Sequence, residues 1–296
     1  MKIVFFGSDY YSTLVINELT KNPNCEIPMV ITGVNDPIYP FEYETINQIC
    51  LRNNIPVIKI SSKDDFASHQ EALRILKFDL GLVASFGYLI PKSIIQIPRL
   101  GILNIHPSLL PEYRGVSPMQ QTILDGRDNT GVTIMKIDHR FDTGEIIQQH
   151  ICPIADTDTT LSLAQKLFPI GASMFLDIIN KYPQGNFPVM PQNGTKATQT
   201  KLITTEQAFL NLNDSDEMNY RKIHAFYPKP MTWCYLPDLI NKYSPHPNPN
   251  LPPKWQKVRV KIYESEMIDK QLFPKTLQLE GKSQITWQQF TLGYLQ

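Results

Sequence analysis

The runs Leu80-Gly-Leu-Val-Ala84 and Gly101-Ile-Leu-Asn-Ile105 indicate the fold most clearly. Each is short and almost wholly apolar, as in a sheet strand that is buried on both faces. Similar runs recur at residues 2–6, 27–31, 55–60 and 132–137, and residues 145–153 are predicted as a further strand. Helical patterns separate them at residues 13–19, 43–52, 64–76 and 161–182, the last with Pro169 expected to kink it. This alternation predicts an α/β domain with a mostly parallel sheet.

The composition changes after residue 182, where the segment Pro183-Gln-Gly-Asn-Phe-Pro-Val-Met-Pro-Gln-Asn-Gly194 is rich in turn-forming residues. We therefore predict a first domain of residues 1–182, a linker of residues 183–202 and a second domain of residues 203–296. The second domain has a helical pattern at residues 218–226 and the strictly alternating run Lys257-Val-Arg-Val-Lys-Ile-Tyr263. Such alternation is typical of a half-exposed strand, so we expect a small, mainly β domain.

The charge of the whole chain is balanced, with 28 basic and 28 acidic residues, but its distribution is uneven. Residues 219–296 hold eleven Lys or Arg against five Asp or Glu, a net charge of +6, so residues 1–218 carry −6. A basic module suggests an anionic partner such as nucleic acid. A basic surface that is merely solvated explains the same count equally well.

The four cysteines, Cys25, Cys50, Cys152 and Cys234, form no Cys-x-x-Cys pair and have no His at zinc-ligand spacing. We therefore expect reduced thiols, no metal site and a cytoplasmic protein. The apolar run at the start stops at Gly7, which suits a buried strand and is too short for a signal peptide. No stretch approaches the length needed to cross a bilayer, so we expect no membrane partner.

Four polar segments follow predicted strands and are expected at one edge of the sheet, where open parallel sheets bind ligands. They are Gly7-Ser8-Asp9, Ser85-Phe-Gly-Tyr-Leu-Ile-Pro91, Asn104-Ile-His106 and Asp138-His-Arg-Phe-Asp142. The first lacks the Gly-x-Gly-x-x-Gly pattern of dinucleotide sites, which disfavours a nicotinamide or flavin enzyme.

Asn104 and His106 form the strongest candidate for a catalytic pair. They lie two residues apart at a strand end, so both side chains leave the same face. Pro107 favours an extended conformation of His106. An amide such as that of Asn104 can stabilise a developing oxyanion, and a carboxylate such as Asp142 can fix the tautomer of a histidine. Because no Ser or Cys nucleophile has an obvious partner, the set favours direct transfer between two bound substrates.

These residues also carry a resemblance to a known family. The stretch Asn104-Ile-His-Pro-Ser-Leu-Leu-Pro-Glu-Tyr-Arg-Gly115, with Asp142-Thr-Gly144 downstream, resembles the signature of the formyltransferases that use 10-formyltetrahydrofolate. The likeness extends over residues 85–91, 98–101 and 131–135. Three features are similar to the members that act on methionyl-tRNA: Tyr-Arg-Gly after Leu-Leu-Pro, Phe226-Tyr-Pro-Lys-Pro-Met-Thr-Trp233, and Leu279-Glu-Gly-Lys282.

The resemblance implies a Rossmann-like formyltransferase domain and a C-terminal OB-like β-barrel that contacts tRNA. It implies a monomer that moves a formyl group from 10-formyltetrahydrofolate to initiator methionyl-tRNA, for translation initiation, by direct attack of the amine. Asn104 and His106 would donate hydrogen bonds to the oxyanion. Asp142 would orient His106 and help to pass the amine proton.

The resemblance also implies binding residues. The folate is expected to contact mainly the backbone of a set of loop residues, namely Phe86, Gly87, Tyr88, Leu89, Ser108, Leu109, Leu110, Pro111 and Asp138. Expected contacts to the acceptor are Arg114, Arg221, Lys222, Lys257, Arg259 and Lys261. For Arg114 a surface ion pair is an equally good interpretation.

Two features depart from the family. Gly7-Ser8-Asp9 stands where the family reads Gly-Thr-Pro. The family's basic, Gly-rich loop after the second strand, which reaches the tRNA acceptor end, is replaced by residues 33–42, which contain no Lys or Arg. The acceptor is therefore left open by the sequence.

Three alternatives follow. A formyltransferase acting on a nucleotide-linked amino sugar shares the Asn–His–Asp set; the missing basic loop favours it, and the C-terminal module counts against it. A hydrolase that releases formate from the same folate carries a regulatory domain in front, whereas this chain begins at its first strand. A nucleic-acid-binding protein with a decayed transferase core is disfavoured by the intact set.

Overall fold

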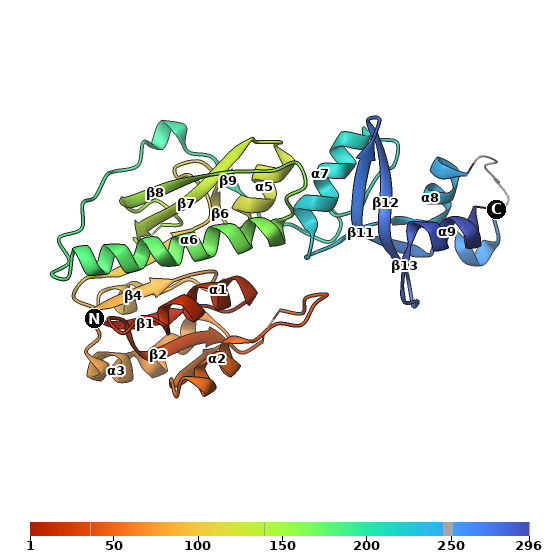
Figure 1. Ribbon diagram of the computed structural model, residues 1–296. Coiled ribbons are helices and arrows are strands. Elements are labelled where there is room, and N and C mark those ends of the chain that lie inside the picture. The colour runs from red at the N-terminus through yellow and green to blue at the C-terminus, as the bar shows by residue number, and fades with distance from the viewer. Residues whose placement is uncertain (36, 139, 245–250, 296) are drawn as a thin grey trace. The chain divides into compact units, whose positions relative to one another are not determined.

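The computed structural model describes residues 1–296 except 36, 139, 245–250 and 296. The chain divides into two compact units (Figure 1). Unit 1 comprises residues 1–118, 128–154 and 163–201, and unit 2 comprises residues 119–127, 155–162 and 202–296. The functional division into a catalytic and an acceptor-binding domain stays a prediction.

Unit 1 is built on a seven-stranded sheet of order β3-β2-β1-β4-β5-β7-β8. Its strands are β1 (Lys2–Phe6), β2 (Glu26–Gly33), β3 (Val57–Ile60), β4 (Leu80–Val83), β5 (Ile102–His106), β7 (Asn129–Lys136) and β8 (Ile146–Pro153). The first five are parallel, whereas β7 and β8 are antiparallel to their neighbours. The mostly parallel α/β class predicted from the apolar runs is therefore confirmed.

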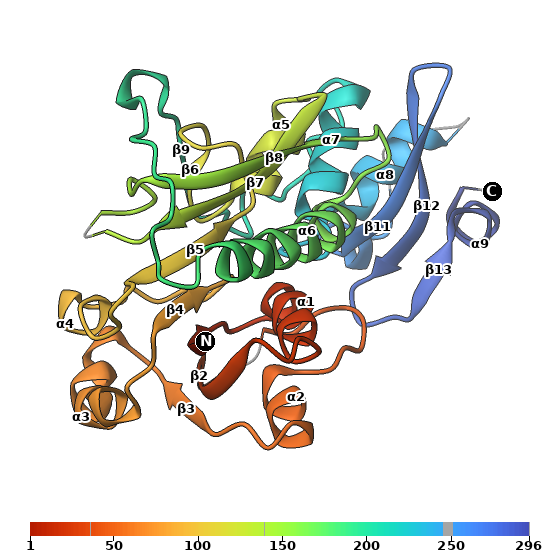
Figure 2. The same cartoon turned by 60° about the vertical axis from the view of Figure 1, so that its left-hand side comes forward.

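Helices cover both faces of this sheet (Figure 2). They are α1 (Tyr10–Leu19), α2 (Ile46–Arg52), α3 (Phe66–Leu76) after the 3-10 turn η1 (Lys63–Asp65), α4 (Lys92–Ile95) and α6 (Thr160–Lys181). Helix α5 (Pro118–Leu124) belongs to unit 2 except for its first residue. Helices α1 and α6 lie on one face, where Tyr11 stacks on Phe168, and α3 and α4 lie on the other. Helix α6 continues through Pro169.

Local capping sets where the first helices begin. Asp9 and Ser12 form a capping box, so α1 begins at Tyr10, three residues before the predicted start. Thr45 and Gln48 form another, so α2 begins at Ile46, three residues after the predicted start. The capping residues are polar, so apolar periodicity does not reveal where these helices begin.

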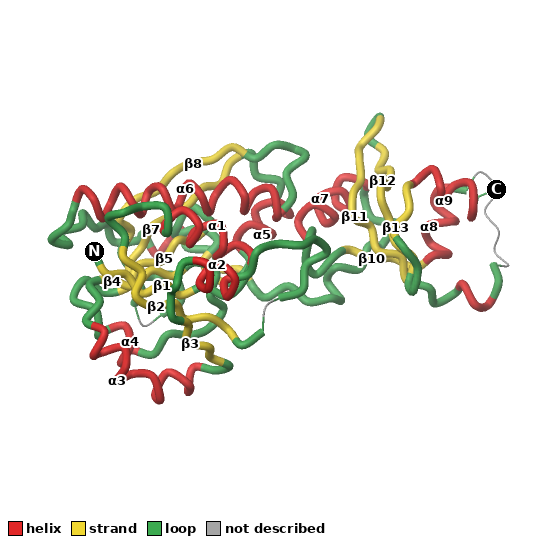
Figure 3. The backbone as a smooth tube through the Cα atoms, turned by 60° about the horizontal axis from the view of Figure 1, so that its bottom comes forward, coloured by secondary structure: helices red, strands yellow, loops and turns green. Residues whose placement is uncertain are grey.

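Unit 2 is a small β domain with flanking helices, which confirms the predicted class (Figure 3). Its antiparallel sheet has the order β10-β11-β12-β13. The strands are β10 (Thr232–Tyr235), β11 (Arg259–Ile268), β12 (Gln271–Leu279) and β13 (Gln284–Thr286), and the helices are α7 (Asp216–Phe226), α8 (Leu236–Tyr243), η3 (Pro253–Trp255) and α9 (Trp287–Tyr294). Val260 and Ile262 enter its core while Arg259 and Lys261 stay exposed, as the alternating run predicts.

The segment predicted to be a linker is attached to unit 1. It contains η2 (Gly194–Lys196) and β9 (Gln199–Thr200), and β9 pairs in parallel with β6 (Arg114–Gly115). Met190 also exchanges two backbone hydrogen bonds with Ile146 of β8. Residues 190–200 are thus held against the elements that carry the candidate site.

Among the described residues, no helix combines the length and the apolar content needed to cross a bilayer.

Candidate active site

Strand β5 brings Asn104 and His106 to one face at the carboxyl end of the parallel strands. Asn104 pairs with Val83 of β4 on one side and with Met135 of β7 on the other. The side chain of His106 is buried, with 4% exposed, whereas Asn104 is half-buried. Because β5 lies inside the sheet, both positions are fixed by hydrogen-bonded neighbours.

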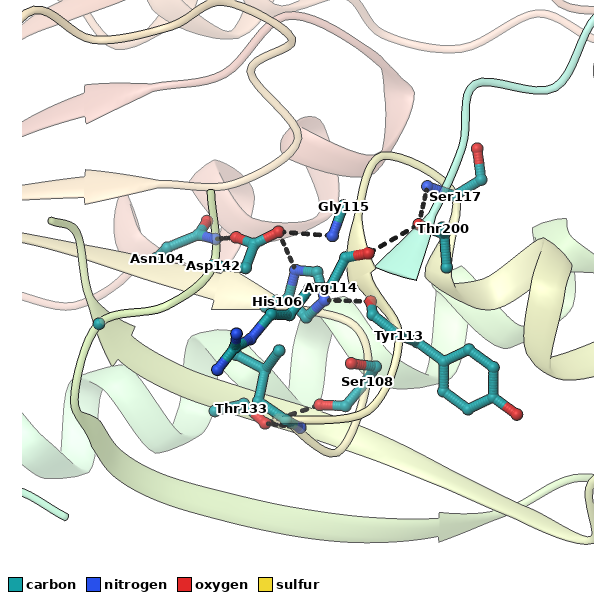
Figure 4. Close-up of polar contacts among 12 residues, drawn as sticks. Asn104, His106, Ser108, Tyr113, Arg114, Gly115, Ser117, Thr133, Asp142 and Thr200 are labelled. Atoms are coloured by element: carbon teal, nitrogen blue, oxygen red, sulfur yellow. Dashed lines mark hydrogen bonds and ion pairs between the residues drawn. The ribbon is translucent and has the colours of Figure 1, made fainter. Parts of the chain in front are cut away.

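Asp142 reaches this pair from the loop between β7 and β8 (Figure 4). Its Oδ2 lies 3.7 Å from Nδ1 of His106, and its Oδ1 accepts a 3.5 Å hydrogen bond from Nδ2 of Asn104. Oδ2 also accepts a 2.8 Å hydrogen bond from the backbone N–H of Gly115. The structure therefore brings together the three residues predicted to be catalytic.

The route to Asp142 differs from the expected one. The four polar segments were expected to follow parallel strands, but β7 is antiparallel to β5, with Lys136 opposite Leu103 and Thr133 opposite His106. The carboxyl end of β7 therefore lies beside the amino end of β5, and the loop that follows returns Asp142 to the site. Asp142 has a φ of 52°, a left-handed conformation that is uncommon for residues other than glycine.

Both ring nitrogens of His106 face protein groups. Nε2 lies 3.0 Å from the carbonyl oxygen of Tyr113, and a carbonyl can only accept, so Nε2 carries a proton. In the neutral ring Nδ1 is then unprotonated and faces the carboxylate of Asp142. This tautomer lets Nδ1 take up a proton beside a negative charge. Because Nε2 is committed to Tyr113 and Nδ1 faces Asp142, this geometry does not support the predicted hydrogen bond from His106 to an oxyanion. It suits instead a proton-accepting pair made of His106 and Asp142.

Residues 107–113 form a loop that is tied to β7 and β8. Thr133 donates a 2.6 Å hydrogen bond to the carbonyl oxygen of Ser108, and it accepts hydrogen bonds from the Leu110 backbone N–H and from Gln149. The Ser108 hydroxyl donates to the carbonyl oxygen of Glu112 within the same loop. Leu110 is buried, so of the predicted folate contacts here Ser108 and Leu110 have inward-facing side chains.

The loop after β4 holds the other predicted folate contacts. Phe86 is buried and packs against Phe6 at 5.6 Å between ring centroids, so its side chain belongs to the core. Gly87 has a φ of 75° and is exposed, and Leu89 is 48% exposed. Tyr88 is half-buried. The backbone of residues 87–89 is the part of this loop that is open to a ligand.

Side chains of two predicted polar segments, residues 7–9 and 138–142, form hydrogen bonds that hold the loops in place. Ser8 donates to the carbonyl oxygen of Phe86, and Ser85 donates to Asp9, so the segment after β1 holds the segment after β4. Asp138 accepts hydrogen bonds from the Arg140 backbone N–H and from the hydroxyl of Thr143. Its carboxylate thus closes the turn that carries Asp142.

Arg114 bonds an amide: its guanidinium donates through Nε and Nη2 to Oε1 of Gln192, at 3.0 and 2.7 Å. The described residues place no carboxylate in an ion pair with it. The amide nitrogen of Gln192 donates to the carbonyl oxygens of Asp142 and Gly144. Gln192 lies in the predicted linker, where composition gives no sign of a site residue. The sequence analysis also missed Thr133 and Thr200, because only their contacts in the folded chain distinguish them from other threonines.

The loop after β2 is held by aromatic residues. The ring of Tyr10 packs edge-on against Phe41 and Tyr43, at 5.1 and 5.3 Å between centroids, and Tyr39 packs against Tyr11. Burial raises the pKa of Tyr39 far above its usual value, and the charge of Asp9 adds to this effect, so Tyr39 stays protonated. In place of a basic loop, the described part of residues 34–44 forms an aromatic cluster on α1.

The predicted acceptor contacts of unit 2 divide into two groups. Arg221 forms an ion pair with Glu217 one turn earlier on α7, and Lys222 donates to the carbonyl oxygen of Phe209. Arg259 and Lys261 are exposed on β11, and Lys257 is exposed two residues before the strand begins.

Aromatic rings lie beside the second group. The guanidinium of Arg259 lies 4.5 Å from the ring centroid of Trp233, and Trp233 packs at 4.9 Å against Phe209 and at 5.5 Å against Tyr235. Trp233 and Tyr235 are half-buried. Cations beside partly exposed rings are typical of surfaces that bind single-stranded nucleic acid.

All four cysteines are free and buried, and burial raises the pKa of Cys25 to about 12 and that of Cys50 to about 11. Within the described ranges, no group of three or more His, Cys, Asp or Glu side chains could hold a metal ion.

Comparisons with known proteins show the family of the chain. Residues 1–179 match the family described as Formyl transferase. The methionyl-tRNA formyltransferase of Ehrlichia chaffeensis is 33% identical over 307 residues, covering 99% of this chain and 97% of that protein. That of Roseiflexus castenholzii is 34% identical over 243 residues, covering 80% of this chain and 77% of that protein.

Solved structures share the fold. The methionyl-tRNA formyltransferase from Clostridium thermocellum has a TM-score of 0.60 at 17% identity, covering 94% of this chain and 98% of that one. The N-formyltransferase from Helicobacter canadensis, solved with folinic acid and dTDP-3-aminofucose, has a TM-score of 0.63 at 20% identity, covering 97% and 98%.

Proposed function

The chain belongs to the formyl transferase family, and from that premise we propose that it transfers a formyl group from 10-formyltetrahydrofolate to the amino group of methionyl-tRNA. The single observation that carries the reaction type is the convergence of Asn104, His106 and Asp142 on the carboxyl edge of the sheet. The acceptor is proposed because the relative that spans almost the whole chain is a methionyl-tRNA formyltransferase.

The geometry supports direct transfer. The amine attacks the formyl carbon, and the carbonyl oxygen gains negative charge. The amide of Asn104 is placed to donate to that oxygen, and removal of one such donor typically costs ~10²–10³-fold in rate. The carbon–nitrogen bond to the folate then breaks, and the amine proton must reach the leaving nitrogen. His106 accepts a proton at Nδ1 and Asp142 stabilises the resulting imidazolium, so this pair would carry the proton.

The formyl donor fits the loops that frame the pair. The exposed backbone of Gly87 and Leu89 can bond a planar ring through its donors and acceptors, and Gly87 adopts a φ of 75° that favours glycine. The loop of residues 138–142 and the loop of residues 108–111 complete the predicted binding residues. Each of these segments is attached to β4, β5 or β7, which fixes its distance from Asn104.

Unit 2 would bind the nucleic-acid part of the acceptor. Its residues 219–296 carry a net charge of +6, and the exposed cations Lys257, Arg259 and Lys261 among them match the charge of a phosphate backbone. The rings of Trp233 and Tyr235 beside them would suit unpaired bases. We further propose a cytoplasmic monomer in which residues 1–182 carry the chemistry and residues 203–296 bind the tRNA.

A second acceptor class is supported by a specific observation. The described residues of the loop after β2 contain no Lys or Arg and pack as an aromatic cluster on α1, so this loop offers no cation to a tRNA acceptor end. A nucleotide-linked amino sugar needs no such loop.

One experiment separates the acceptors. The full chain is incubated with labelled 10-formyltetrahydrofolate in separate reactions. One contains charged initiator methionyl-tRNA as the acceptor, and the others contain nucleotide amino sugars. We expect label on the methionyl amino group. Label on the sugar amine alone would overturn the tRNA assignment, and free labelled formate without any acceptor product would indicate a hydrolase.

A further inference from the structure

We propose that residues 190–200 form a strap that positions Asp142 and His106, with Gln192, Thr198 and Thr200 as its positioning residues. The proposal rests on the proposed function in one respect: the kinetic test measures formyl transfer. The strap is the segment that composition predicts to be a linker, and all of its contacts described below lie within unit 1.

The strap acts through β6. The carbonyl oxygen of Tyr113, directly before β6, accepts from Nε2 of His106, and the N–H of Gly115, at its end, donates to Oδ2 of Asp142. The residues at the two ends of β6 therefore each contact one catalytic group. A displacement of β6 would move both contacts at once.

The strap is hydrogen-bonded to β6 and to the residues on either side of it. Thr198 accepts a 2.7 Å hydrogen bond from the Tyr113 backbone N–H, and its carbonyl oxygen accepts from the Arg114 N–H. Thr200 donates to the carbonyl oxygen of Arg114 and accepts from the Ser117 N–H, both at 3.1 Å. A Cβ on Gly115 would lie 2.6 Å from the carbonyl oxygen of Thr200, so this close approach requires a glycine.

Gln192 links the strap to the loop of Asp142. Its side-chain oxygen accepts both hydrogen bonds from Arg114, and its nitrogen donates to the carbonyl oxygens of Asp142 and Gly144 at 2.9 and 2.8 Å. The amide of Gln192 thus accepts two hydrogen bonds from the cation and donates two to the loop, which satisfies all of its donors and acceptors. The loop carries Asp142 in a left-handed conformation, which such bonds stabilise.

The test compares Gln192→Leu and Thr200→Val with two controls on the same strap. Gln199→Leu removes an exposed side chain of β9, and Thr195→Val removes a hydroxyl that bonds only within its own turn. We expect kcat to fall about ten- to a hundred-fold for Gln192→Leu and Thr200→Val, because small misplacements of reacting groups have such effects. The KM for 10-formyltetrahydrofolate should change less than about twofold, and both controls should match the wild type.

A double-mutant cycle shows whether Gln192 acts through Asp142. In an Asp142→Asn background, Gln192→Leu should lower kcat by much less than in the wild type, since residues that act as a unit are not additive. Equal losses in both backgrounds would overturn the proposal and indicate a general loss of fold, which far-ultraviolet circular dichroism would report independently.

A spectroscopic readout keeps the test independent of the acceptor. The imidazole nitrogen resonances of His106 should shift in Gln192→Leu and Thr200→Val and stay in place in both controls. If the wild type formylates an amino sugar and not methionyl-tRNA, the proposed acceptor fails and the kinetics are measured on the sugar. If kcat and the His106 resonances are unchanged in both strap variants, the strap fails whatever the acceptor.

Discussion

At the scale of single residues, Asn104 has the role that is easiest to isolate. Its amide lies beside Asp142 on β5 and is half-buried, so a substitution leaves little empty space in the core. We expect Asn104→Ala to lower kcat ~10²–10³-fold, as for loss of an oxyanion donor, with folate affinity changed little. Steady-state kinetics with the formyl donor varied would measure both.

The control is Asn47→Ala on α2, which removes the same group from a half-buried position outside the site. An unchanged kcat in Asn104→Ala would contradict the oxyanion role.

Gly144 gives a second prediction at this scale. A Cβ at this position would overlap the backbone carbonyl oxygen of Lys136, so the loop must shift to admit any side chain. Because the Asp142 loop ends here, we expect Gly144→Ala to lower kcat at least about tenfold and to cost about 1–3 kcal/mol of stability, as overpacking does. The measurements are kcat and the denaturation midpoint by circular dichroism.

Gly194→Ala is the matched variant, since an added Cβ there would meet no atom within 4 Å and the backbone is not left-handed. A Gly144→Ala protein with wild-type kcat would show that the loop can move without consequence for Asp142.

At the scale of elements, β11 and the residues before it carry the prediction about the acceptor. We expect replacement of Lys257, Arg259 and Lys261 by Ala to weaken tRNA binding and to flatten the dependence of affinity on salt by two to three phosphate contacts, each worth about 0.7–0.9 in the logarithmic slope. Binding titrations over a series of salt concentrations would measure the slope. Transfer to a minimal amine acceptor should barely change.

The control removes the same charge from exposed positions elsewhere in unit 2, by replacing Lys254, Lys275 and Lys282 with Ala. Equal slopes for the two triple variants would mean that net charge, and no particular face, attracts the tRNA. An affinity insensitive to salt and to both triples would leave the amino sugar as the better acceptor.

At the scale of the whole molecule, the stability of unit 2 should depend on pH. His224 of α7 is 7% exposed, and its Nδ1 has no hydrogen-bond partner among the described residues. Burial lowers the pKa of His224 below its usual value, although the backbones of Asp158, Asp156 and Ser265 oppose the change. Unit 2 thus favours the neutral ring.

The sign follows from the lowered pKa. Above about pH 6.5, the usual value for histidine, the ring is neutral in both states and its burial has no protonation cost. As the pH falls below that value, the unfolded chain binds a proton that the folded unit resists. We therefore expect unit 2 to lose stability on acidification, by at most about 1.4 kcal/mol per pH unit from this group. Tryptophan fluorescence during urea unfolding reports it, since Trp233, Trp255 and Trp287 all lie in unit 2.

His224→Phe should flatten this dependence, because the ring that packs against Tyr220 is kept and the ionisation is removed. His150→Gln, at an exposed position, should leave the dependence as it is. A wild-type midpoint that does not fall between pH 7 and pH 5 would contradict the prediction.

The sequence by itself determined the order and type of most elements and singled out the candidate catalytic residues. Apolar runs such as Leu80–Val83 and the alternation of β11 are local patterns, so burial could be predicted from them directly. The spacing of Asn104 and His106 placed both on one face for the same reason. Asp142 was predicted from its place after a neighbouring strand, and the stretch that resembles the family includes it as well.

Only the tertiary structure decided how Asp142 reaches the pair. Whether β7 runs parallel or antiparallel to β5 depends on long-range pairing, which leaves no mark in a buried strand that is apolar in either direction. The contacts of Gln192 with Arg114 and with the Asp142 loop join positions 78 and 50 residues apart. Their hydrogen bonds form only once the chain has folded, so the composition of residues 183–202 could predict a linker but not a strap.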